Sequence, residues 1–391
     1  MLRQAGEGRK TEGNENVVDR TENGPARRGF FSRRPKDRRP SRGARNGFVI
    51  FLNFLFSLAV IGLLGGAAVL YWGKAQFERP GPLTQEATFM VPRGGGLASI
   101  SAGLEREGII ASAEIFQAGV RVSGAGSGLR AGEYAFEPGV SMRSVMDALV
   151  AGRSIQHAVT VPEGWTVDRV WERLAANDAL AGDLPEKPAE GTILPDTYVF
   201  TRGATRADIV RQMTEAHASV VEEIWAGRDE GLPIDTIEEF VTLASIVERE
   251  TGVAEERPHV ASVFINRLRD GMRLQSDPTF IYGIWGGAGK PPGEPLRRSH
   301  IQSDTPYNTY VINGLPPGPI ANPGRASLEA VAHPLDTNDY YFVADGTGGH
   351  AFAQTLDQHN ANVRAYRALM AERAASAEVQ AEAEEDATLV E

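Results

Sequence analysis

Two glutamates and an arginine directly follow an apolar run in the stretch LASIVERETG, residues 243–252. Carboxylates are more often found at the start of a helix, where the helix dipole favours negative charge. At 100° per residue, Glu248 continues the apolar stripe of a helix that starts near Ile237, whereas Glu250 lies beside a second apolar face. We therefore expect a mostly buried helix whose last turn carries carboxyl groups into apolar surroundings. Its only polar side is formed by Thr242, Ser245 and Arg249.

This placement suggests acid–base chemistry. Apolar surroundings and a helix C-terminus both disfavour the charged form of a carboxyl group. A glutamate there would hold a proton near neutral pH, as a general acid must. The structural alternative is that Glu248 or Glu250 simply pairs with a buried arginine. Periodicity alone does not choose between the two glutamates.

The charge distribution indicates a membrane anchor. Residues 1–47 hold 13 Lys and Arg against 6 Asp and Glu, although the whole chain carries a net charge of −11. Residues 48–72 are uncharged and long enough to cross a bilayer core of about 30 Å, whereas a signal peptide has an apolar region of about 7–15 residues. We predict a disordered basic cytoplasmic tail over residues 1–45, a transmembrane helix over 46–73, and export of the remaining chain. Orientation explains the basic tail without nucleic acid.

The composition excludes several kinds of site. The chain has no cysteine, so disulfides, thiolate metal sites and a cysteine nucleophile are excluded. The seven histidines lack a paired metal-binding spacing such as H-E-x-x-H, and no P-loop is present. We therefore expect neither a metal nor a cofactor.

Periodicity predicts an α+β fold. After a linker over residues 74–87, the segment 88–177 reads as three strand–turn–helix units with Pro/Gly turns. Amphipathic helices and then long Pro-, Gly- and Asn-rich loops follow up to residue 370, and loops of this kind often carry functional sites. Residues 371–391 read as a fraying helix and an acidic tail.

Several motifs in one order resemble the endolytic murein transglycosylases, the MltG or YceG-like family of membrane-anchored bacterial enzymes that cut peptidoglycan strands. Besides LASIVERET, the matching stretches are EGTILPDTYVF (190–200), VASVFINRLRDGMRLQSDPTFIYG (260–283), SDTPYNTY (303–310), GLPPGPIANPG (314–324) and GGHAFAQTLDQHNANV (348–363). The resemblance covers roughly residues 88–370. The basic tail and the acidic C-terminus are not part of the pattern.

The resemblance implies a reaction and an organisation. The catalytic acid of the family maps onto Glu248, which would protonate the glycosidic oxygen after N-acetylmuramic acid and then, as a base, help to close a 1,6-anhydro ring. Residues 88–180 would be a LysM-like glycan-binding region and residues 181–370 the catalytic domain. The protein would cross the cell inner membrane once, with its catalytic domain in the periplasm. It would act on nascent strands beside peptidoglycan synthases or division proteins.

Sugar sites combine aromatic rings with amide and hydroxyl groups, which indicates a set of substrate-binding candidates. These are Glu250, Thr251, Gln275, Ser276, Tyr307 and Asn308. A hydrolase normally needs a second carboxylate. The candidates for one are Glu190, Asp196, Asp277 and Asp304, although Asp in polar turns more often caps backbone amides.

Two other functions stay open at this point. A muramidase would hydrolyse the same bond with water, and an anchored wall-binding or divisome scaffold would have no catalysis. The mass of the products distinguishes a muramidase from a transglycosylase. The effect of Glu248→Gln on product release distinguishes an enzyme from a scaffold.

Overall fold

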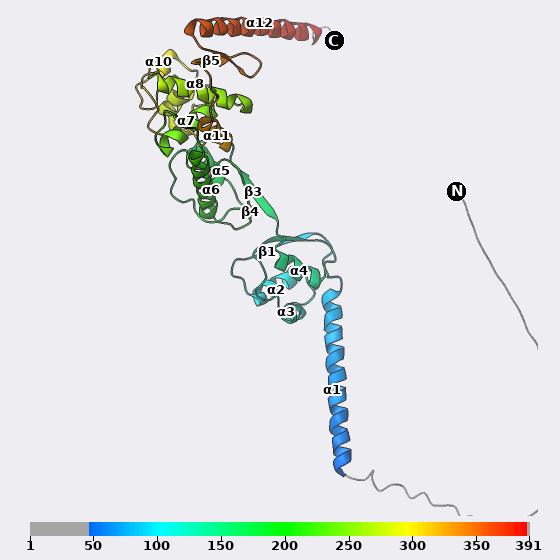
Figure 1. Cartoon of the computed structure of the whole chain (residues 1–391). Coiled ribbons are helices and arrows are strands. Elements are labelled where there is room, and N and C mark those ends of the chain that lie inside the picture. Colours follow the sequence, from blue (N-terminus) through cyan, green and yellow to red (C-terminus); the bar gives the residue numbers. More distant parts are fainter. Residues whose placement is uncertain (1–46, 389–391) are drawn as a thin grey trace, which may run out of the picture. The chain divides into compact units, whose positions relative to one another are not determined.

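The computed structural model describes residues 47–388 (Figure 1), so the predicted basic tail over residues 1–45 lies outside the described residues. The first element, α1 (Gly47–Glu78), has 32 residues, which at 1.5 Å per residue is about 48 Å. Among the described residues it is the one helix long and apolar enough to cross a membrane. It extends beyond the predicted span, and Phe77 near its end packs into a folded core. The ring centroids of Phe77 and Phe116 are 6.2 Å apart there.

The first small core contains two strands and three helices. Strand β1 pairs antiparallel with β2, with Phe89 opposite Tyr134. Ser112 and Ser141 cap the second and third helices with their side chains, as expected of serine at a helix start. The elements are β1 (Ala87–Val91), α2 (Leu97–Arg106), α3 (Ala113–Val122), β2 (Gly132–Phe136) and α4 (Met142–Ala151).

The third strand–turn–helix unit of the sequence analysis belongs to a separate core. Strand β3 (Gln156–Thr160) pairs antiparallel with β4 (Thr197–Thr201), beyond residue 180. Helices α5 (Val167–Ala175) and α6 (Arg206–Ala226) complete this core. Local periodicity identifies the strand but carries no information about its partner. The three units therefore do not form one region.

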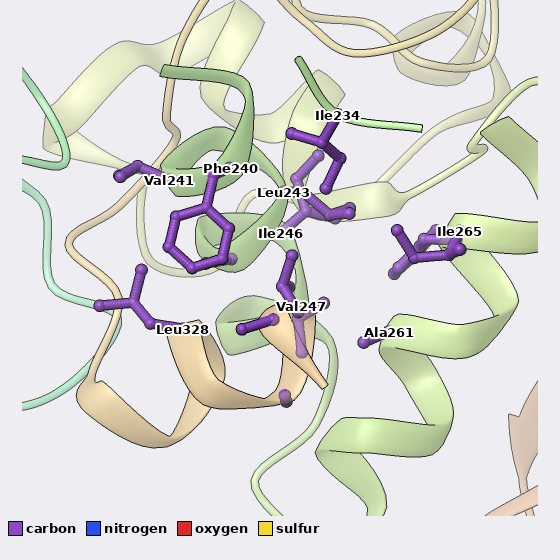
Figure 2. Packing of buried hydrophobic residues seen from close by; sticks show 14 of the residues in the cluster. Ile234, Phe240, Val241, Leu243, Ile246, Val247, Ala261, Ile265 and Leu328 are labelled. Atoms are coloured by element: carbon purple, nitrogen blue, oxygen red, sulfur yellow. The ribbon is translucent and has the colours of Figure 1, made fainter. Parts of the chain in front are cut away.

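The central core is built on α7 (Ile237–Glu250). Thr236 and Glu239 form a capping box at its start, and every residue from 240 to 247 is buried. Figure 2 shows Phe240 and Val247 packed with Leu328 of α11 (Arg325–Ala332), and α8 (Arg257–Arg269) on another side. The prediction of a mostly buried helix is confirmed. Two residues of the predicted polar side are buried as well: Thr242 donates to the carbonyl of Glu238, and Ser245 to that of Thr242, whereas Arg249 is exposed.

The remaining elements are short helices, one hairpin and the C-terminal helix. A long irregular segment, residues 302–324, precedes α11. Strands β5 and β6 pair antiparallel. The elements are η2 (Ala254–Glu256), α9 (Asp277–Trp285), η3 (Gly286–Ala288), α10 (Arg298–Ile301), β5 (Tyr341–Ala344), β6 (His350–Ala353) and α12 (Leu356–Thr388). The fold class is thus α+β, and most of the predicted acidic tail is helical.

Candidate active site

The side chain of Glu248 is 4% exposed in the last turn of α7. Its Oε2 accepts a hydrogen bond from the backbone amide of Gly324 at 2.9 Å, and its Oε1 lies 3.4 Å from Nη2 of Arg257. The carboxyl group is therefore buried as predicted, but its surroundings are more polar than an apolar groove. A guanidinium group and a backbone amide both point at it.

A second carboxylate shares the same arginine. Nη2 of Arg257 lies 3.0 Å from Oε2 of Glu163, whose side chain is 44% exposed. Glu163 follows β3 in the turn before α5, and the sequence analysis did not select it. A Cβ at Gly324 would overlap the Glu163 carboxylate, so the glycine leaves the space that this carboxylate occupies.

The turn over residues 162–165 is fixed to the central core by one buried asparagine. The amide of Gly164 donates to the carbonyl of Asn322 at 3.0 Å, and the amide of Asn322 donates to the carbonyl of Trp165 at 2.9 Å. Nδ2 of Asn322 also donates to that carbonyl at 2.8 Å. Gly164 has a φ of 70°, and a Cβ there would lie 3.5 Å from Cγ of Glu248. The turn thus passes directly over the Glu248 side chain.

Glu190 lies on the other side of Asn322. Its Oε1 accepts from the amide of Val167 at 2.9 Å and from Nδ2 of Asn322 at 3.3 Å, and its Oε2 is 3.4 Å from the Tyr282 hydroxyl. Burial raises the pKa of Glu190 to about 7, although the hydrogen bonds from Val167, the Gly191 amide and Tyr282 act in the opposite direction. Of the four predicted second carboxylates, Glu190 is the one bonded to Asn322, which fixes the turn over Glu248.

Glu250 has the carboxyl environment that the sequence analysis expected near the end of α7. Burial, with a smaller contribution from the nearby Asp277 charge, raises its pKa to about 7. The Ser276 hydroxyl donates a short hydrogen bond to the carboxyl, and this bond lowers the pKa, as do the charges of His350 and Arg267. The structure thus brings together two of the predicted site residues, Glu250 and Ser276.

The other predicted substrate-binding residues differ in accessibility. Gln275 is exposed and has a φ of 51°, the one positive φ among the described residues other than glycine. Tyr307 is half-buried, with its ring 4.9 Å from that of Tyr282. Asn308 is fully buried, and its side chain bonds the backbone of Ile301, Ser303 and Tyr310.

Thr251 is also buried and bonds the Val253 amide at 3.0 Å and Glu256 at 3.4 Å. The hydrogen bonds of Thr251 and Asn308 therefore hold loops in place. Among the predicted second carboxylates, Asp277 accepts from the Tyr310 hydroxyl at 2.7 Å and Asp196 from the Thr197 amide at 2.6 Å. Asp304 is exposed.

Sequence reasoning missed Arg257, Glu163 and Asn322. One signal for Arg257 was available, because it precedes a proline at the start of a helix, where the helix dipole disfavours a cation. A buried arginine at such a position needs a carboxylate partner. Glu163 and Asn322 lie in turns whose contacts span 94 and 157 residues of sequence, so no local pattern indicates them.

Histidines in this part of the chain make pairwise contacts with carboxylates. His259 lies 2.8 Å from Asp339, and His350 lies 2.7 Å from Glu256. Within the described residues, no group of three or more His, Cys, Asp or Glu side chains could hold a metal ion.

The comparisons place the chain in a family. Residues 89–365 match the YceG-like family, and the chain belongs to that family. A relative from Bacillus subtilis named endolytic murein transglycosylase is 31% identical over 334 residues, which cover 76% of this chain and 89% of the relative. A relative of the same name from Streptococcus pneumoniae is 27% identical over 365 residues, 81% of this chain; the match spans 64% of that relative's length. A crystal structure of a yceG-like protein from Listeria monocytogenes is 28% identical, with a TM-score of 0.47, over 71% of this chain and 98% of that one.

Proposed function

We propose that this protein is a membrane-anchored lytic transglycosylase, which cleaves the MurNAc-β-1,4-GlcNAc bond within nascent peptidoglycan strands and leaves 1,6-anhydro-MurNAc ends. Membership of the YceG-like family and the name of the Bacillus relative support the substrate and the class of reaction. The observation that carries the proposal is the buried Glu248, held between Arg257 and the Gly324 amide.

In the first step, Glu248 donates its proton to the bridging oxygen while the bond from that oxygen to C1 of the muramyl residue breaks. The leaving sugar departs with a free hydroxyl group, and positive charge develops at C1. Glu248 becomes a carboxylate with two hydrogen-bond donors already in place, Nη2 of Arg257 and the amide of Gly324. Preorganised donors stabilise a developing charge without reorganisation at the moment of reaction.

In the second step, the Glu248 carboxylate removes the proton from the C6 hydroxyl of the same muramyl residue. The C6 oxygen then bonds to C1 and closes the anhydro ring. Glu248 regains its proton, and no water is consumed. One group can perform both tasks when its proton affinity suits both the donation and the removal.

The exposed side of the site indicates where the glycan would bind. Glu248 is 4% exposed and Glu163 is 44% exposed, so the strand would approach past the turn that contains Glu163. Gln275 is an exposed candidate for a bond to the glycan, and its positive φ is a strained conformation of the kind that clusters at functional sites. Tyr307 would contribute a ring face. Ser276 directly follows Gln275 and bonds Glu250, so this pair would hold the backbone next to Gln275 in place.

The organisation of the chain fits an enzyme that works at the membrane. We propose that α1 anchors the protein in the cell inner membrane as a single span, with the catalytic domain in the periplasm. Of the region predicted over residues 88–180, the core of β1, β2 and α2 to α4 would be the LysM-like glycan-binding part, and β3 and α5 would join the catalytic domain predicted over residues 181–370. Tethering limits its reach to strands near the membrane, where peptidoglycan synthases or division proteins would be its partners.

The muramidase alternative gains one specific observation, the presence of Glu163 beside Glu248. Glycoside hydrolases use two carboxyl groups about 5–5.5 Å or 6.5–9.5 Å apart. Here both groups contact the same guanidinium nitrogen, at 3.0 and 3.4 Å. The guanidinium charge of Arg257 lies nearer to Glu163 than to Glu248. This favours a role in which Glu163 positions other groups over one in which it reacts with the glycan.

The test uses two substitutions in the same helix. Glu248→Gln keeps the shape of the side chain and removes its acid–base function, so release of fragments from purified glycan strands should stop while co-sedimentation with the strands persists. Glu238→Gln, at an exposed position in the first turn of α7, is the matched control and should retain activity. Unchanged release by Glu248→Gln would refute the assignment of the acid. Loss of folding, seen by circular dichroism, would be distinguished from loss of chemistry by the binding measurement.

A further inference from the structure

One guanidinium nitrogen serves two carboxylates at the site. Arg257 is 8% exposed, and its Nη2 lies nearer to Glu163, at 3.0 Å, than to Glu248, at 3.4 Å. Its Nε is buried and has no hydrogen-bond partner among the described residues. The arginine is therefore held in place by burial and by the two carboxylates, and its contact with Glu163 is the shorter one.

The two carboxylates differ in access to water. Glu163 is 44% exposed, so water stabilises its negative charge in addition to Arg257. Glu248 is 4% exposed, so its charge depends on the protein groups that it contacts. Of two carboxylates that share one cation, the less solvated one depends more on that cation.

We propose that Glu163 is a positioning residue for Glu248 that acts through Arg257, by holding the guanidinium while Glu248 carries its proton and yielding it when Glu248 becomes charged. This inference rests on the proposed role of Glu248 as acid and base. Before cleavage, Arg257 pairs mainly with Glu163. After Glu248 has given its proton to the glycosidic oxygen, Arg257 moves closer to Glu248 and water compensates Glu163. The movement reverses when Glu248 regains a proton from the C6 hydroxyl.

The other charged groups near Glu248 are directed elsewhere. Arg249, from the same helix, donates to the Gly164 carbonyl at 3.3 Å. Arg325, from α11, pairs with Glu223 at 3.0 Å and with Glu329 at 3.4 Å. Glu250 bonds Ser276. Among the charged side chains of the described residues, Arg257 is thus the one bonded to Glu248, and it is bonded to Glu163 as well.

Gly324 provides a way to displace Glu163 without a change of charge. Its φ of −76° and ψ of 167° are accessible to any residue, but a Cβ there would overlap the Glu163 carboxylate. The overlapped atoms belong to the end of a flexible side chain that is half exposed, so Glu163 would move. The backbone amide that donates to Glu248 would remain.

The experiment measures the pH dependence of turnover for the full-length protein in detergent, with purified glycan strands as substrate. A general acid acts while protonated, so the rate should fall on the alkaline side of the profile. In Glu163→Gln, Arg257 is free to pair with the Glu248 carboxylate and a neighbouring negative charge is gone. The alkaline limb of the rate profile should therefore move down by about one pH unit. Turnover above the limb should fall about tenfold, whereas the acid-side plateau should stay within about threefold.

Two variants make the result specific. Glu172→Gln, at an exposed position of α5, is the matched control and should leave the limb in place. Gly324→Ala should move the limb in the same direction as Glu163→Gln, because it displaces the carboxylate that competes for Arg257.

The outcomes separate this inference from the proposed function. An unmoved limb in both Glu163→Gln and Gly324→Ala would overturn the positioning role while leaving Glu248 as the acid. Loss of turnover at every pH in Glu163→Gln, with strand binding intact, would also overturn it, because Glu163 would then act directly on the substrate. Retained activity in Glu248→Gln would instead refute the proposed function itself.

Discussion

Glu250→Gln should change the pH dependence of stability by removing a carboxyl group that is costly to ionise in the fold. Burial is the main reason that the pKa of Glu250 is about 7 in place of its ordinary 4.5. A raised folded pKa means that the folded protein holds the proton more tightly than the unfolded chain. The contribution of Glu250 to stability is therefore fully present below about pH 4.5 and is lost as the pH rises to about 7.

The magnitude follows from the two pKa values. A difference of one pKa unit corresponds to about 1.4 kcal/mol, so the rise from 4.5 to about 7 is worth about 3 kcal/mol. Glutamine at this position can still accept the hydrogen bond from the Ser276 hydroxyl. Any cost of burying the additional N–H groups of the amide is independent of pH. The difference in unfolding free energy between Glu250→Gln and wild type should thus move by about 3 kcal/mol in favour of the variant from about pH 4.5 to pH 8.

The assay is urea unfolding followed by tryptophan fluorescence at several pH values across this range. Trp225 packs 5.4 Å from the ring of Phe240 in α7, so part of the signal reports the core that carries Glu250. Glu222→Gln, at an exposed position of α6, supplies the baseline for a glutamate-to-glutamine change. Glu190 has a raised pKa as well, but its contribution is common to all three proteins and cancels.

A stability difference that stays constant over the pH range would refute the reasoning. It would mean that the Glu250 carboxyl is hydrated or compensated by a cation. A difference that moves in the opposite direction would show that the folded state stabilises the charged form of Glu250, with His350 and Arg267 as the nearby cations.

Further predictions concern the support of the site and the anchor. Asn322→Ala removes the bond at 3.0 Å to the Ile193 amide and one of the two bonds to the Trp165 carbonyl, which keeps its bond from the backbone amide of residue 322; the change should cost about 1–3 kcal/mol in thermal or urea unfolding, and a loss below about 0.5 kcal/mol would contradict this expectation. Gly164→Ala places a Cβ near Glu248 at a φ of 70° and should lower turnover at least about tenfold, whereas Gly139→Ala, with a φ of 74° and open space, should stay within about twofold; equal effects would show that the turn does not position Glu248. Removal of residues 1–72 should move the protein from the membrane fraction to the soluble fraction, and persistence in the membrane would mean that α1 is not its anchor.

The sequence was most informative where a local period fixes the result. The apolar stripe that starts at Ile237 predicted the buried helix α7, because each residue of a helix turns by a fixed angle. The same reasoning placed Glu248 and Glu250 at its end but could not choose between them. Their environments depend on Arg257, Gly324 and Ser276, which periodicity does not locate.

Contacts between residues distant in the sequence could not be predicted, for a physical reason. The pairing of β3 with β4 and the placement of Glu163 over Gly324 are set by how separate segments pack, and each segment is compatible with several partners. Arg257 is the exception, because its position in the sequence carries a local signal. A cation at the first position of a helix opposes the helix dipole, so its presence indicates a compensating carboxylate.

In the proposed reaction Glu248 alone gives and recovers the proton, so that the muramyl C6 oxygen and not water attacks C1. Mass spectrometry of the fragments that the wild-type protein releases from purified glycan strands in ¹⁸O-labelled water tests this directly. Every new muramyl end should be a 1,6-anhydro end, one water lighter than a reducing end and free of ¹⁸O. Reducing ends that carry ¹⁸O would contradict it, and would make Glu163 and Glu248 the two carboxyl groups of a hydrolase.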